Sequence, residues 1–286
     1  IIMNRGIVLS PDFKFLPNGR TFFKASSDPD ELRKYLLYWD KIDVPLTRLV
    51  RFSSSDFDFL SDSGVLTRTP YSVHNHSFAE IRDSYRITLP RAAGIEILEA
   101  HNAVFALMTS REPGLWSKAQ MSTDLMAVNG VSREVIEIEL YNLVPVPNDL
   151  TPLGEILKFK KTRQDELLAF RCYLDDIYQK IISSADLPRA KSTEIQKLER
   201  SINDVHRVLN ESKIKIKLRS MKSVVSGVDG LIGVFTGVAA APFIPFSPII
   251  AGVAATGLTI ACKMITHADN TIPNQFTYLK SINDGF

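Results

Sequence analysis

The sequence predicts an α+β fold, with α/β as the open alternative, and two observations carry this prediction. Short apolar runs closed by proline, which are typical of strands, fall in the first half of the chain. Long stretches with apolar residues at helical spacing fill the second half. We therefore expect a mixed α/β domain at residues 1–147 with a small sheet, joined to an all-helical domain at residues 148–286.

The first predicted elements are a strand and a helix. Residues 5–11 form an apolar run that ends at Pro11, which predicts a buried strand near the centre of the sheet. Asp28 then supplies an N-cap, and Pro29 suits the first helical position. A helix should run from there to about Lys41, with apolar residues at helical spacing: Leu32, Tyr35, Leu36 and Trp39.

Shorter elements follow before the predicted domain boundary. Residues 49–52 are a strand candidate, residues 56–66 predict a short helix ending at Gly64, and residues 77–109 are expected to be helix-rich around a break at Pro90.

The last predicted strand covers residues 135–144, where apolar and charged residues alternate before Pro145. This pattern places Glu137 and Glu139 on one face. The two carboxylates would suit nuclease-like chemistry only with further partners, so a solvated sheet face is the favoured interpretation.

The helical half begins with two heptad stripes on either side of a short turn. They predict two long helices, residues 153–183 and 189–218, that pair as an antiparallel coiled-coil hairpin spanning residues 153–218. Two unrelated amphipathic helices that pack on the sheet domain are the alternative. The stripes are Leu167, Phe170, Leu174, Ile177 and Ile181, and then Ile195, Leu198, Ile202, Val205 and Leu209.

An apolar tract from Val224 to Cys262 is the most unusual stretch, since Asp229 is its only charged residue. Prolines between residues 242 and 248 divide it, which predicts an apolar helical hairpin over residues 224–265. Each arm has roughly 15–19 residues, near or below the roughly 20 that a helix needs to cross a bilayer. The hairpin must therefore be buried in protein, covered in an oligomer interface, or inserted in lipid.

A basic run precedes the apolar tract and is a candidate site for an anionic surface. Its position beside the tract favours binding to an anionic membrane, whereas a solvated helix end is the alternative. The run consists of Lys213, Lys215, Lys217, Arg219 and Lys222.

Composition narrows the classes of function. The formal net charge of +2 provides no global field for nucleic acid. The two cysteines, Cys172 and Cys262, lie in apolar helical patterns and are expected to be buried thiols in a reducing compartment. No secretion signal is evident at the start of the sequence, so we expect a cytoplasmic protein that can associate with a membrane.

The commonest catalytic and nucleotide-binding motifs are absent from the sequence. His74 and His76 could hold a metal only with ligands from elsewhere, so a polar loop is favoured. Arg200 and His206 have the residue types of a ribonuclease element, but their spacing splits them across a helix. We predict no catalytic residue, no metal ligand and no cofactor, and these four residues are expected not to be catalytic.

Three segments carry a family resemblance: residues 5–11 (RGIVLSP), residues 31–42 (ELRKYLLYWDKI) and residues 159–171 (FKKTRQDELLAFR). The chain resembles a family of bacterial proteins classed as a domain of unknown function, without an assigned activity or catalytic residues. The resemblance implies a bacterial, cytoplasmic origin and an N-terminal strand and helix joined to a helical C-terminal region.

The leading functional hypothesis is a non-enzymatic interaction protein that self-associates, as a homo-oligomer or with a protein partner, through its helical region. A role as a membrane-acting effector in bacterial conflict is part of this hypothesis. The alternative is a hydrolase, most plausibly a nuclease, that uses an unrecognised site in the N-terminal domain.

Overall fold

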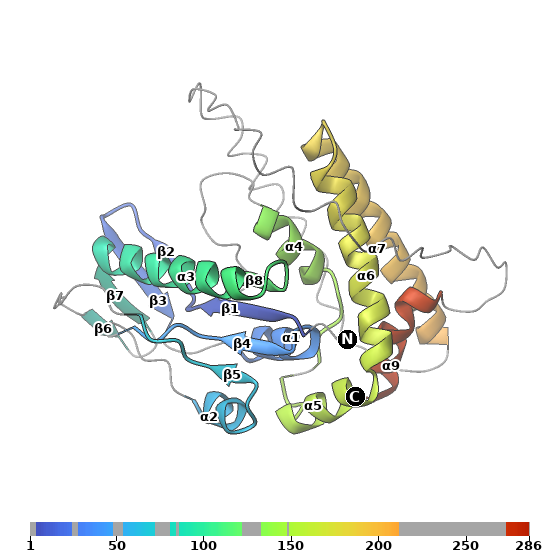
Figure 1. Cartoon of the computed structure of the whole chain (residues 1–286), viewed down its shortest axis with the longest axis horizontal. Helices are drawn as coiled ribbons and strands as arrows, with labels where there is room; N and C mark the ends of the chain where they lie inside the picture. The colour runs from blue at the N-terminus through green and yellow to red at the C-terminus, as the bar shows by residue number, and fades with distance from the viewer. Residues whose placement is uncertain are drawn as a thin grey trace. The chain divides into compact units, whose positions relative to one another are not determined.

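A computed structural model describes residues 4–24, 28–47, 54–71, 81–83, 86–121, 133–147, 149–211 and 273–285 (Figure 1). One compact unit comprises Ile1–Met221 together with Ile272–Phe286, and a second comprises Lys222–Thr271. The predicted basic run and apolar hairpin lie outside the described residues, as does the strand candidate at residues 49–52.

A four-stranded parallel sheet forms the centre of the first unit. Its strands are β1 (Gly6–Ser10), β4 (Lys41–Asp43), β5 (Leu66–Thr67) and β8 (Trp116–Gln120), in the order β5-β4-β1-β8. Every neighbouring pair is parallel. All five residues of β1 are buried, and β1 has a neighbour on each side, so the predicted central strand is confirmed.

Helices provide the crossovers that parallel strands require. Helix α1 (Pro29–Tyr38) leads from β1 toward β4, α2 (Ser55–Asp62) connects β4 to β5, and α3 (Arg91–Arg111) precedes β8 (Figure 1). The predicted N-cap of α1 is confirmed, because the Asp28 side chain accepts hydrogen bonds from the backbone of Asp30 and Glu31. The predicted helix ending at Gly64 is α2, and Gly64 adopts a φ of 73°.

A second, antiparallel sheet has the order β2-β3-β7-β6. Its strands are β2 (Phe13–Phe15), β3 (Arg20–Lys24), β6 (Ile81–Asp83) and β7 (Arg86–Pro90). Phe13, Phe23, Ile87 and Leu89 from this sheet pack with Ala93 and Ile97 of α3. The prediction of helix before Pro90 was wrong, because residues 86–90 pair with β3, a partner that local spacing does not reveal.

The predicted strand at residues 135–144 was also wrong, since α4 (Arg133–Asn142) is a helix. The alternating sequence fits both structures: Ile136, Leu140 and Leu143 recur at helical spacing, and all three are buried. Helix α4 packs on β8 and α6, and this tertiary contact decides between the two patterns. Glu137 accepts a hydrogen bond from the Ser117 hydroxyl at 2.7 Å, whereas the Glu139 side chain lies outside the described residues.

The described part of the second half, residues 149–211 and 273–285, is mostly helical as predicted. It contains α5 (Leu153–Thr162), α6 (Gln164–Ile182), α7 (Leu187–Glu211), a short 3-10 turn η2 (Asn274–Phe276) and α9 (Thr277–Gly285). The expected single helix at residues 153–183 is divided at Arg163, whose φ of −111° leaves the helical range. The sequence left residues 266–286 as a short helix or a tail, and α9 is a helix.

Helices α6 and α7 contact each other and are joined by residues 183–186 (Figure 1). The whole first stripe is buried, as are Leu198 and Ile202 of the second, while Ile195 is half-buried. The side chains of Val205 and Leu209 are outside the described set. Because α6 also contacts α4 and α9, its stripe serves a shared core, and coiled-coil packing stays a prediction. The boundary after residue 147 likewise stays a prediction, although α5 packs on α1.

The stripe on α6 provides a direct test of this packing. Leu174 is only 2% exposed, so Leu174→Ala should lower the free energy of unfolding by about 2–5 kcal/mol through lost burial and a residual cavity. Leu168 on the same helix is 43% exposed, and Leu168→Ala should cost less than about 0.5 kcal/mol. Urea unfolding of both variants measures the two losses, and equal losses would contradict a packed stripe.

Candidate functional site

The two ends of the parallel sheet carry different polar groups. In open sheets with helical crossovers, ligands bind outside the carboxyl ends of the strands, where strand order reverses. Here that edge contains the ends of β1, β4, β5 and β8 together with the first turn of α1. The carboxyl edge is therefore the place to look for a binding site.

Asp43, the last residue of β4, is the most unusual group at this edge. Its side chain is 0% exposed. Oδ2 accepts hydrogen bonds from the hydroxyls of Thr67 at 2.7 Å and Thr69 at 2.6 Å. Oδ1 is buried without a hydrogen-bond partner among the residues that the structure describes. The Thr69 backbone adds a third hydrogen bond to this carboxylate, while Oδ1 keeps acceptor capacity that no described residue uses.

Burial raises the pKa of Asp43, and the hydrogen bonds from Thr69 and Thr67 oppose this shift only in part. A buried carboxylate with an unpaired oxygen costs free energy, because charge leaves water without a compensating partner. Perturbed acids of this kind cluster at functional sites. Asp43 is accordingly our candidate acid–base or ligand-binding group.

A buried ion pair lies at the start of α1, on the same edge. Lys34 Nζ is 2.5 Å from Glu31 Oε2 and 2.6 Å from Asn142 Oδ1, and both charged side chains are 0% exposed. The neighbouring Tyr35 donates a hydrogen bond to the backbone oxygen of Gln120 at the end of β8. This cluster ties α1, α4 and β8 together, so its first role is structural.

The ends of β1 and β8 are joined by backbone and side-chain hydrogen bonds. The Met121 amide donates to the Ser10 carbonyl at 2.9 Å, and Gln120 Nε2 donates to the Phe13 carbonyl at 2.7 Å. On the α3 side, His101 lies with Nε2 2.8 Å from the Val8 carbonyl. Burial lowers the pKa of His101 to about 4, so the ring is neutral and fixes α3 on β1.

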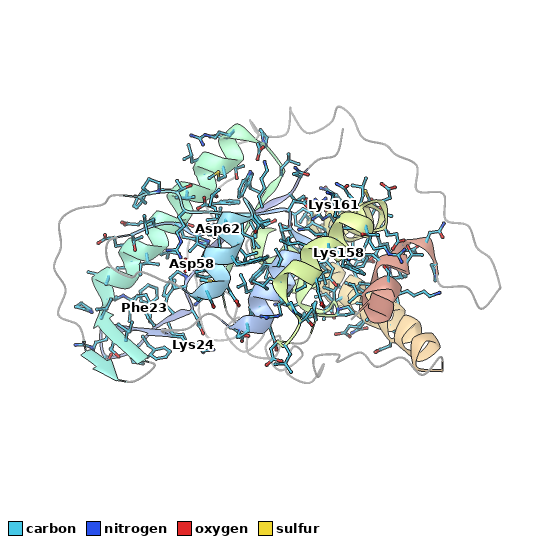
Figure 2. The ribbon with its side chains drawn as sticks, turned by 90° about the horizontal axis from the view of Figure 1, so that it is seen from below. Phe23, Lys24, Asp58, Asp62, Lys158 and Lys161 are labelled. Atoms are coloured by element: carbon cyan, nitrogen blue, oxygen red, sulfur yellow. The ribbon has the colours of Figure 1, made fainter. Side chains whose placement is uncertain are left out.

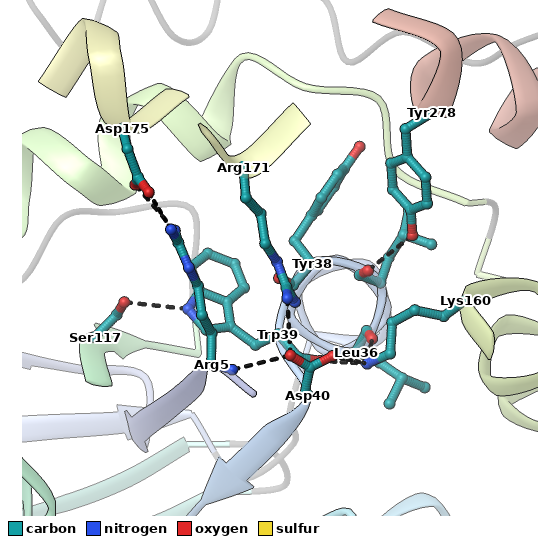
Figure 3. A network of polar contacts seen from close by, with 11 residues as sticks. Arg5, Leu36, Tyr38, Trp39, Asp40, Ser117, Lys160, Arg171, Asp175 and Tyr278 are labelled. Carbon is teal, nitrogen blue, oxygen red and sulfur yellow. Dashed lines mark hydrogen bonds and ion pairs between the residues drawn. The ribbon is translucent and has the colours of Figure 1, made fainter. Parts of the chain in front are cut away.

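The opposite edge of the sheet carries a polar network around the carboxyl end of α1 (Figure 3). A helix leaves its last carbonyls without helical partners, and α1 has no basic residue in its last turn. Three other helices supply the donors. Lys160 of α5 donates to the Leu36 carbonyl at 2.9 Å, Tyr278 of α9 to Leu37 at 3.0 Å, and Arg171 of α6 to Tyr38 at 3.0 Å.

Asp40 completes this network just beyond the helix end. It accepts from Arg171 at 2.8 Å and from the Arg5 amide at 2.9 Å, and it lies 3.6 Å from Lys160. Although burial raises the pKa of Asp40, these cationic partners lower it overall. Burial brings the pKa of Lys160 down to about 8, against the opposing charge of Asp40. Arg5 pairs in turn with Asp175 of α6. Every charge here has a partner, as expected of a structural junction.

Most of the residues singled out by sequence lie outside the described part of the chain. The basic run Lys213, Lys215, Lys217, Arg219 and Lys222 lies outside the described residues, as do His74, His76 and the side chain of His206. Arg200 is exposed on α7. Cys172 is half-buried rather than buried, and Cys262 is outside the described ranges.

The described part of the chain lacks two features of common functional sites. It contains no group of three or more histidine, cysteine, aspartate or glutamate side chains placed to hold a metal ion. None of its helices combines the length and the apolar character that crossing a membrane demands.

A model of a family of unknown function (DUF6236) matches residues 20–286. The chain belongs to this family. The finding confirms the resemblance to a family classed by an unknown function, and this family supplies no activity or site to transfer. No curated protein and no solved structure matches the chain.

Sequence reasoning missed Asp43 because it extended the preceding helix to about Lys41 and left no room for β4. One local signal was present. The apolar Ile42 is followed by the acidic Asp43, and Pro45 comes two residues later, as at the end of a short buried strand. Strand β4 has only three residues and depends on pairing with β1 and β5, so local periodicity is too short to reveal it.

The raised pKa of Asp43 predicts a pH dependence of stability. The folded protein holds this proton more tightly than the unfolded chain, so ionised Asp43 lowers stability at neutral pH and the penalty disappears as pH falls toward the ordinary pKa of 3.8. The wild type should therefore gain stability relative to Asp43→Asn between pH 7 and pH 4 in urea unfolding. Thr67→Val removes a donor to the carboxylate and should extend the dependence to higher pH. A constant difference between wild type and Asp43→Asn would contradict the assignment.

Proposed function

We propose that the chain is a non-enzymatic interaction protein whose folded body holds both ends of the apolar tract at residues 224–262. The observation that supports this most directly is the position of α9. Helix α7 ends at Glu211 before the tract, α9 begins at Thr277 after it, and the two helices contact each other.

Helix α9 and the turn before it are firmly held. Phe276, Tyr278, Leu279 and Ile282 are buried. The Tyr278 hydroxyl reaches the Leu37 carbonyl, and the Ser281 hydroxyl donates to Glu166 of α6 at 2.8 Å. The chain thus leaves the body at α7 and returns to the same group of helices, which supports a tract presented as a closed loop.

A loop held at both ends restricts how the tract can meet a partner. It can enter a bilayer only as a hairpin or re-entrant segment, with both ends on one side. This agrees with arms of roughly 15–19 residues, which are short for two independent spans. The preceding basic run would add roughly 1 kcal/mol of attraction per charge near an anionic surface. We propose a cytoplasmic protein whose tract is covered by protein at rest and can move to an anionic membrane, as a conflict effector would require.

Vesicle flotation tests this function. The purified chain should float with vesicles of phosphatidylcholine and phosphatidylglycerol at low salt, and with pure phosphatidylcholine vesicles far less, because the basic run attracts anionic lipid. Gly252→Asp places a charge in the second arm and should reduce flotation at least about tenfold, given the free energy of burying a charge in lipid.

The matched control keeps the apolar tract and removes the charge. Glutamine at Lys213, Lys215, Lys217, Arg219 and Lys222 should abolish the preference for anionic vesicles. If the wild-type chain never floats, the membrane function is rejected, and if Gly252→Asp floats like the wild type, binding does not involve insertion of the tract.

Asp43 supports a second candidate function, the nuclease-like hydrolase. Its unpaired oxygen could accept a proton from an attacking water or bind a divalent cation. Cleavage of labelled single- and double-stranded oligonucleotides with Mg²⁺ or Mn²⁺ tests this. Asp43→Asn keeps the side-chain shape and should lower the cleavage rate by about 100-fold or more. Cleavage that persists in Asp43→Asn, or that is absent from the wild-type chain, excludes Asp43 as the catalytic group of such a nuclease.

A further inference from the structure

Helix α2 carries charge of one sign only. Asp56, Asp58 and Asp62 lie on it, and it contains no basic residue. Asp58 and Asp62 are exposed and stand one turn apart, on one face. Like charges at this spacing destabilise a helix by a few tenths of a kcal/mol when nothing opposes them.

Helix α5 carries two exposed lysines, together with one exposed carboxylate, Glu155, in its first turn. Lys158 and Lys161 are exposed and three positions apart, so they share a face. The third lysine, Lys160, is turned inward to the carboxyl end of α1 and is not part of this surface.

The two helices are neighbours on the side of the molecule seen in Figure 2, where Asp58 and Asp62 are labelled on α2, and Lys158 and Lys161 on α5. A Cβ added at Gly154, on the first turn of α5, would lie 3.7 Å from Cζ of Phe59. Phe59 is 43% exposed, which makes it one of few large apolar side chains that reach the surface of the described structure. We name Asp58, Asp62, Phe59, Lys158 and Lys161 the bipolar face.

The charged side chains of the bipolar face form no ion pairs within the described structure. No ion pair joins Asp58, Asp62, Lys158 or Lys161 to another described residue, although Asp56 lies 3.9 Å from Arg33. The face therefore offers a negative strip and a positive strip on either side of an exposed aromatic ring.

The two oppositely charged strips of the bipolar face restrict which partners can bind to it. A polyanion such as nucleic acid would be repelled by α2, and a polycation would be repelled by α5. A partner must present a positive strip beside a negative one, at the same separation and around an apolar centre. A second copy of this chain has that surface.

We propose that two copies of the chain form a symmetric dimer through the bipolar face. A two-fold axis that runs between α2 and α5, in the plane of the interface, places α2 of each copy opposite α5 of the other. The Asp58 and Asp62 carboxylates then meet the Lys158 and Lys161 ammonium groups twice, once on each side of the axis. Phe59 of one copy lies close to Phe59 of its partner, where aromatic contacts add affinity. This dimer gives a location to the self-association expected from the sequence and does not depend on the apolar tract.

Charge reversal of the full chain tests this dimer by sedimentation equilibrium. The wild type should be dimeric at low salt and dissociate toward monomer near 1 M NaCl, where screening acts within about 3 Å. Asp58→Lys with Asp62→Lys makes both strips positive and should raise the dimer Kd about tenfold or more. Lys158→Asp with Lys161→Asp makes both strips negative and should have the same effect.

Two combinations make the test specific to this geometry. An equimolar mixture of the two reversed variants should form a heterodimer, because each positive strip again faces a negative strip. A chain with all four substitutions should regain the homodimer. Asp176→Lys with Lys180→Asp reverses an exposed pair on α6 and should leave the wild-type Kd unchanged, as the matched control.

Circular dichroism confirms that each variant is folded, so a change in the dimer Kd can be assigned to the interface. A monomeric wild type at 100 µM overturns the proposal. Reversed variants that dimerise as strongly as the wild type, or a mixture that stays monomeric, overturn it as well. None of these results bears on vesicle flotation, so a failure of the dimer and a failure of the membrane function are distinguishable.

Discussion

The carboxyl end of α1 is the junction on which the rest of the structure depends. Its last carbonyls are buried and lack helical partners, and the helix end carries a partial negative charge, so they require hydrogen-bond donors that α1 itself does not supply. Lys160 of α5, Arg171 of α6 and Tyr278 of α9 donate hydrogen bonds to these carbonyls. One helix end therefore assembles three helices that are distant in sequence, and it places the last helix of the chain against the first.

The two edges of the parallel sheet show how differently buried charge can be used. Asp40, at the amino edge, is surrounded by cations that favour its ionised form. Asp43, only three residues later at the carboxyl edge, has hydroxyl donors on one oxygen and no partner for the other among the described residues. The first arrangement stabilises the fold. The arrangement around Asp43 lowers stability, and proteins retain such destabilising groups where a functional site requires them.

Local signals predicted the elements that depend on local chemistry. The Asp28 cap and Pro29 fixed the start of α1, and helical spacing identified the buried apolar positions of α6, although not the buried Arg171. Local signals gave the wrong secondary structure where an element depends on contacts with residues distant in sequence. Residues 86–90 became a strand through β3, residues 133–142 became a helix through β8 and α6, and three-residue β4 left no periodic signal at all. The candidate group Asp43 was missed for that last reason, whereas the bipolar face depends on which helices lie side by side, which spacing alone does not give.

Because α9 packs against α7, these two helices anchor the two ends of the segment between them, and this affects how freely that segment can change in length. The entropy lost on closing a flexible loop grows only with the logarithm of its length, and each doubling costs about 0.6 kcal/mol. Residues 212–272 connect two helices that touch, so the contact between α7 and α9, and not the length of the segment, sets the distance between its two anchors. The anchors, Tyr278 above all, can therefore stay fixed while the segment between them changes in length. Under the proposed function, recognition and stability would be carried by different stretches of one chain, and each could evolve without the other.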